Sequence, residues 1–167
     1  HDYSAAMREL VKTYPDDLDA ATLFAESLMM LRPWQLWDLA GEPAPGTLEL
    51  VAVLESVLRR NPDHAGANHF YIHAVEASPE PGRADAAADR LRQLQPGLGH
   101  MVHMPSHIDV RRGRWQQAIE ANARAIEADR RYTARSPQQQ FYRLYMAHNH
   151  HMLAYAAMMN GQSRLAL

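Results

Sequence analysis

Histidine is the residue type with the most chemical potential in this sequence, with ten among 167 residues. Segment 99–108, GHMVHMPSHI, contains His100, His103 and His107. His103 and His107 are four residues apart, so on a helix they share one face and can reach one ion. Imidazole nitrogens suit Zn, Cu, Fe or Ni better than Ca or Mg. The spacing predicts a transition-metal site, with a binding groove and ordinary helix packing as the alternatives.

Counting back from three glycines that follow predicted helices places further side chains on equivalent helix positions. Gly82, Gly113 and Gly161 are each expected in a tight turn between two helices. Positions thirteen, ten and six residues before each glycine fall on one helical face, and most of them hold histidine. With one more histidine at the edge of that face, the predicted metal ligands are His69, His73, Glu76, His100, His103, His107, His148 and His151.

Helix geometry limits which of these residues can share an ion. Residues seven apart on one helix are separated by about 10.5 Å of rise, so His100 and His107 cannot both bind it readily. Helices that pack about 8–10 Å apart bring imidazoles from two helices within reach of one ion. Nearby methionines would add soft ligands for Cu(I) or simply fill a core; they are Met101, Met104, Met146 and Met152. Asn68 and Asn149, each beside a candidate histidine, are expected to orient the rings.

Helices must position these side chains, because strand signals are nearly absent and helix-forming residues dominate. Breaks at Gly and Pro predict helices over 3–14, 17–31, 47–60, 65–77, 83–94, 100–112, 114–130, 138–160 and from 162 onward. GEPAPG at 41–46 is the clearest loop. Pro105 either kinks its helix or lies in the first turn, with GHMVHM as a loop. The sequence predicts an all-α protein.

Segment MPSHIDVRRGRWQQAIEANARAIEAD resembles a tetratricopeptide repeat, with small Ser106, Gly113 in the turn, Trp115, and Ala118 and Ala125 for close packing. AYAAMMNGQSRLAL has the same shape, and HFYIHAVEASPEPGRADAAADRLRQLQP is a looser version. The resemblance implies a helical-hairpin solenoid, a right-handed α-α superhelix. Residues 1–167 would form a single helical-repeat domain from a longer protein. The turn glycines are 31 and 48 residues apart, against a usual period of about 34, so an insertion is expected near 131–142.

Three His-rich segments carry a narrower resemblance. PDHAGANHFYIHAVEAS, GHMVHMPSHI and YMAHNHHMLA together resemble a group of bacterial tetratricopeptide-like proteins with the same helices. This resemblance implies a bacterial origin and supports the fold, and it assigns no activity. The concave face of such a solenoid commonly binds a protein or peptide. A metal-free interaction module is therefore the main alternative to metal binding.

Composition excludes several other classes of function. A formal net charge of -2 argues against nucleic acid and anionic membranes as partners. The absence of Cys removes disulfides, thiolate catalysis and Cys-ligated zinc. No apolar run approaches the roughly 20 residues of a membrane span, and no signal peptide is evident, which predicts a soluble protein of the bacterial cytoplasm or periplasm.

Enzyme signatures are missing from the sequence. It has no H-E-x-x-H zinc motif, no G-x-S-x-G elbow and no phosphate-binding glycine loop. A two-His-one-carboxylate iron site assembled from His73, Glu76 and a histidine of the next helix is one construction. A metal-dependent enzyme of unknown reaction is thus the third hypothesis, and whether the chain is an enzyme stays open.

Overall fold

The protein is all-α, as predicted. The computed structural model describes residues 2–167, and this part contains helices and no strand; Trp37 and Pro43 form an isolated β-bridge. The chain divides into two compact units, residues 1–87 and 88–167. None of the described helices is both long and apolar enough to cross a membrane.

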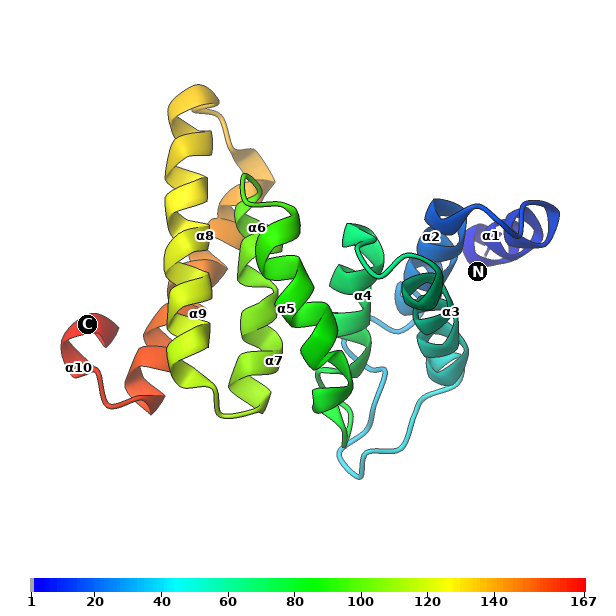
Figure 1. The fold of residues 1–167 in the computed structure, drawn as a ribbon, viewed down its shortest axis with the longest axis horizontal. Helices are drawn as coiled ribbons and strands as arrows, with labels where there is room; N and C mark the ends of the chain where they lie inside the picture. The colour runs from blue at the N-terminus through cyan, green and yellow to red at the C-terminus, as the bar shows by residue number, and fades with distance from the viewer. Residues whose placement is uncertain (1) are drawn as a thin grey trace. The chain divides into compact units, whose positions relative to one another are not determined.

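The N-terminal unit packs three helices around α2 (Figure 1). The helices are α1 (Asp2–Thr13), α2 (Leu18–Met29), α3 (Thr47–Arg60) and α4 (Ala65–Val75), and the short 3-10 helix η1 (Pro81–Ala84) follows. α2 contacts α1, α3 and α4. Phe24 of α2, Leu54 of α3 and Ile72 of α4 are buried. α4 carries His69 and His73, so its buried face fixes where these rings lie.

The C-terminal unit is organised around α8, its longest helix (Figure 1). Its elements are α5 (Asp85–Leu94) from Ala88 onward, α6 (Gly99–His103), α7 (Pro105–Arg111), α8 (Trp115–Arg135), η2 (Gln140–Tyr142), α9 (Arg143–Met159) and α10 (Ser163–Ala166). α8 contacts α6, α7 and α9. Ala118, Ala121 and Ala125 of α8 are fully buried, and such small side chains let neighbouring helices approach closely.

Three predicted helices differ from the structure by several residues. The helix expected over 138–160 begins as α9 only at Arg143, after η2. The helix expected over 100–112 is divided into α6 and α7, with Pro105 in the first turn of α7. Proline is tolerated there because that turn needs no N–H donor from it. The alternative that GHMVHM forms a loop is wrong, since Gly99–His103 is helical. α8 also continues to Arg135, five residues beyond the predicted end, because no helix breaker precedes Ser136-Pro137.

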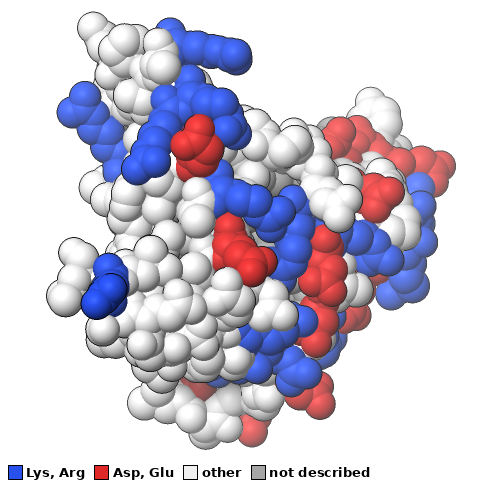
Figure 2. Space-filling view, turned by 60° about the vertical axis from the view of Figure 1, so that its left-hand side comes forward, with Lys and Arg blue, Asp and Glu red and all other residues white. Residues whose placement is uncertain are grey.

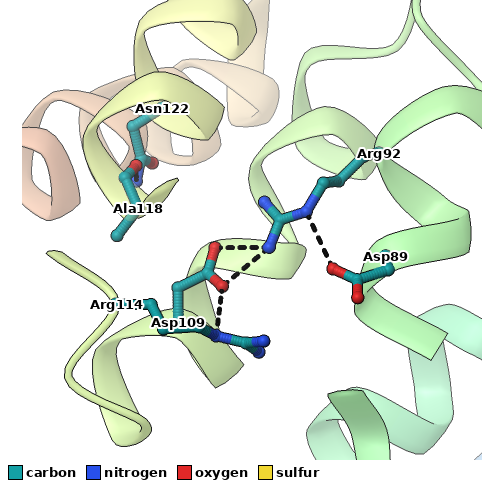
Figure 3. A network of polar contacts seen from close by, with 6 residues as sticks. All are labelled: Asp89, Arg92, Asp109, Arg114, Ala118 and Asn122. Carbon is teal, nitrogen blue, oxygen red and sulfur yellow. Dashed lines mark hydrogen bonds and ion pairs between the residues drawn. The ribbon is translucent and has the colours of Figure 1, made fainter. Parts of the chain in front are cut away.

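A buried ion pair ties α7 to its neighbours (Figure 3). The Asp109 carboxylate is fully buried and accepts two contacts from Arg92 Nη2, at 2.7 and 2.8 Å. Arg114 Nε lies 3.1 Å from the same carboxylate. Burial raises the pKa of Asp109, while the two guanidinium groups favour its charged form. The contacts join α5, α7 and the residue before α8.

Gly113, in the turn between α7 and α8, provides a test of this turn. Its φ of 70° lies in the left-handed region, and a Cβ there would meet nothing within 4 Å. A side chain at this position therefore costs only backbone strain. Because valine is β-branched and tolerates positive φ poorly, we expect Gly113→Val to lower the free energy of unfolding by about 1–2 kcal/mol. Urea denaturation measures this change.

Gly97 is the matched control for this prediction. A Cβ at Gly97 also meets nothing within 4 Å, and its φ lies outside the left-handed region. Gly97→Val should leave stability nearly unchanged, and Gly113→Asn should lose less than Gly113→Val because Asn tolerates positive φ. Equal losses at the two glycines would show that positive φ is not what the turn requires.

Candidate metal centre

Three of the predicted ligands converge inside the C-terminal unit. His103 ends α6, His107 lies in α7, and His148 lies in α9. One ring nitrogen from each lies within 4.8 Å of the other two. Nε2 of His103 and Nε2 of His107 are 2.9 Å apart, and the ring centroids of His103 and His148 are 4.8 Å apart. The i, i+4 pair across Pro105 thus meets a third imidazole from a different helix.

A hydrogen-bond chain fixes which nitrogen of His103 carries the proton. Asn122 of α8 is fully buried, and its Nδ2 donates to the carbonyl of Ala118 at 2.8 Å. That bond leaves the Asn122 Oδ1 to accept, and Nδ1 of His103 lies 2.8 Å from it. Nδ1–H of His103 is therefore the donor, since Oδ1 has no hydrogen. The lone pair of His103 then resides on Nε2 and faces His107.

His103 is also held in its neutral form. Its side chain is fully buried, and this loss of solvent lowers the pKa well below the ordinary value of 6.5. The nearby rings of His107, His148 and His100 lower the pKa further, while the bond to Asn122 opposes them. A neutral imidazole whose lone pair is directed at a second imidazole has the state that metal ligation requires.

The spacing of the three nitrogens suits a small transition-metal ion. With Zn–N bonds of about 2.0–2.1 Å, two nitrogens of a tetrahedral site are about 3.3 Å apart. The 2.9 Å separation of His103 Nε2 and His107 Nε2 needs only a slight opening to reach that value. In the metal-free state one of the two nitrogens must carry a proton to make this hydrogen bond. An ion would replace that proton.

His100 and His151 lie beside the three-histidine cluster. The His100 ring stacks on His103 with centroids 5.8 Å apart, and its other neighbour is Tyr145 at 4.8 Å. The His151 ring is 6.3 Å from that of His148. These two predicted ligands therefore flank the cluster within the same unit.

The remaining predicted ligands lie at the end of α4 in the N-terminal unit. The rings of His69 and His73 are 5.0 Å apart. His73 Nδ1 lies 2.8 Å from the Glu76 carboxylate, which orients that ring. These three residues are three and four residues apart along α4 and its C-cap.

The orienting residue of the cluster was not predicted. Asn68 and Asn149 do not play that role, since the amide of Asn68 donates to Pro62 and His64 carbonyls and that of Asn149 to Asp129. Asn122 plays it instead. The signal was available in the sequence, because Asn122 interrupts an otherwise alanine-rich face of α8, and a polar residue at a core position needs a partner.

Comparisons with known proteins leave the chain unassigned. No family model matches it, and no curated protein matches it either. The resemblance to tetratricopeptide repeats consequently stays a prediction.

The lowered pKa of His103 makes stability pH-dependent. The folded protein keeps His103 neutral at a pH where the unfolded chain protonates it, so the unfolded state binds more protons below about 6.5. Stability from this site is fully present above that pH and is lost as pH falls, by up to about 1.4 kcal/mol per unit. Urea denaturation of chelator-treated protein between pH 7.5 and 5 measures this loss of unfolding free energy.

His103→Asn is the control for this measurement. An asparagine amide nitrogen takes the place of Nδ1 and keeps a donor toward Asn122, yet it does not titrate. We expect a shallower dependence on pH in this variant. The same slope in both proteins would contradict the assignment of the acid loss to His103.

Proposed function

We propose that this chain is a tetratricopeptide-like helical-repeat protein that binds a transition-metal ion through His103, His107 and His148. The observation that carries the proposal is the convergence of three ring nitrogens within 4.8 Å. Ligand sets made only of imidazoles favour Zn, Cu, Fe or Ni. Which of these metals binds in the cell depends on the site geometry and on metal availability. His100 and His151 support the same site from beside it.

Two features distinguish this cluster from histidines that merely pack. Asn122 holds the tautomer of His103, as residues behind metal ligands commonly do. Burial keeps His103 neutral, which removes the competition of protons for its lone pair. The helical-repeat part of the proposal rests on successive helices in contact, such as α7 with α8 and α8 with α9, and on the positive φ of Gly113 and Gly161 at two predicted turns.

A metal-free protein-interaction module is the second candidate. It is favoured by large apolar side chains exposed on and beside α9, which are Phe141, Leu144, Tyr155, Met158 and Met159. Exposed apolar clusters commonly mark protein-binding surfaces. This candidate expects no response of the fold to chelator.

Metal binding is tested on protein purified without a His-tag or nickel column. Elemental analysis should find a transition metal, and chelator should lower the melting temperature, which added metal restores. A free metal concentration 100 times its Kd stabilises the fold by about 2.7 kcal/mol. We expect His107→Ala to abolish binding and His103→Ala and His148→Ala to weaken it severely, measured by equilibrium dialysis with Zn²⁺.

His150→Ala is the matched control for these variants. His150 is on α9, two residues from His148, and lines a surface hollow with Thr133 and Met146. It should keep full binding. His64→Ala should also keep it, although it loses a cap, because His64 Nδ1 accepts from Ala67 N at the start of α4. Intact metal stoichiometry in the double variant of His103→Ala with His107→Ala would overturn the proposed site.

The ligands predicted on α4 are tested by the same assay. His69→Ala, His73→Ala and Glu76→Gln each report whether a bound ion depends on this group. Loss of metal in any of them, with the fold retained by circular dichroism, would add that residue to the ligand set.

Asn122 is predicted to act as a positioning residue. Asn122→Leu removes the acceptor of His103 Nδ1–H and should weaken Zn²⁺ binding about 10–100-fold. Asn122→Asp restores an acceptor at the same place and should recover most of the affinity. Equilibrium dialysis of both variants separates this role from a structural one, because both lose the amide donor to Ala118. Equal affinities in the two variants would contradict it.

A further inference from the structure

The charge of the ligand set restricts what else the metal can bind. His103, His107 and His148 are neutral as ligands, so a divalent ion in this site keeps its full double charge. The C-terminal unit places no carboxylate in this group among the described residues. Three protein ligands also leave one position of a tetrahedral ion for an outside molecule.

The acidic side chains buried in this unit are committed elsewhere. Asp109 is held between Arg92 and Arg114. Asp129 accepts from Tyr142 Oη at 3.0 Å and from Asn149 Nδ2 at 2.7 Å. Neither carboxylate is available to balance the charge of an ion at the histidines without breaking these bonds.

The whole unit is also positively charged. Residues 88–167 contain eleven arginines, no lysine and five acidic side chains, whereas residues 1–87 contain six basic and fourteen acidic side chains. The net charge of -2 for the chain conceals this division. In Figure 2, blue side chains gather at the end of the unit where α8 finishes. Such a field raises the local concentration of anions.

The side chains around the cluster are suited to an anion as well. His100 lies against His103, His151 lies against His148, and Tyr145 lies against His100. Neutral imidazole and phenol groups each offer a hydrogen-bond donor. His107 and His148 are only partly buried, so a small molecule can reach them.

We infer that the metal bound by His103, His107 and His148 takes a small anion as its remaining ligand. The inference rests on the proposed metal site. It names the chemical class of the ligand that this site accepts: a monoanion with a lone pair for the metal, such as a carboxylate, azide or hydroxide.

Co²⁺ and azide test the inference on the full chain. Co²⁺ replaces Zn²⁺ in such sites and its visible absorption reports the ligands. Equilibrium dialysis first measures Co²⁺ per chain, which tests the metal site alone. Azide is then titrated into the loaded protein. We expect a saturable change in the visible bands, with an affinity at least about tenfold above that for metal-free protein by calorimetry, a difference of about 1.4 kcal/mol. Acetonitrile, a neutral molecule of similar shape, should give no such change.

Each other outcome overturns a defined part of the argument. Bound Co²⁺ with no response to azide leaves the metal site standing and overturns the anion inference. An equal response to acetonitrile does the same, since the site would not select charge. Equal azide affinity without metal would assign binding to the arginine surface. Absence of bound Co²⁺ overturns both proposals. His150→Ala should behave as the unaltered chain.

Discussion

The buried carboxylate of Asp109 is the contact on which the C-terminal unit depends. Arg92 of α5 and Arg114, directly before α8, both reach it, while Asp109 itself belongs to α7. A buried charge is costly unless paired and hydrogen-bonded, so the three segments have one favourable arrangement around it. His107 lies two residues before Asp109 on the same helix, and Asn122 lies two turns beyond Arg114 on α8 (Figure 3). The ion pair therefore positions α7, which carries the candidate ligand His107, against α8, whose Asn122 hydrogen-bonds the candidate ligand His103.

Close approach of α6 to α8 is the second constraint, and Gly99 permits it. A Cβ at Gly99 would clash with Oδ1 of Asp129, so any side chain there would force the two apart. Asp129 and Asn122 lie on one face of α8, seven residues apart. The absence of a side chain at Gly99 lets the start of α6 rest on Asp129, and four residues later His103 reaches Asn122. Pro105 then begins α7 without a lost hydrogen bond.

Local sequence signals predicted the elements better than the site. The helix at 47–60 was predicted at both ends, because Gly46 precedes it and Asn61-Pro62 ends it. Histidine spacing brought His103 and His107 to one face, since i, i+4 periodicity is a property of the chain itself. The meeting with His148 and the role of Asn122 depend on distances between helices, which periodicity does not contain. The packing of α8 against α6 and α9 sets them. The difference in net charge between the two units follows from counting charged residues in the sequence. That count requires the boundary after residue 87, which the structure supplies.

The cost of the histidine cluster argues that it does more than fill space. An apolar side chain at position 103 could be buried without any hydrogen-bond partner. His103 instead needs Asn122 as the acceptor for Nδ1–H and a proton on His107 as the donor to Nε2. Asn122 in turn occupies a buried face of α8 that is rich in small alanines. Polar groups of this kind lower stability when any member is unsatisfied. Their arrangement also directs the lone pair of His103 Nε2 at His107, with the ring of His148 beside both, which is the geometry that metal ligation needs.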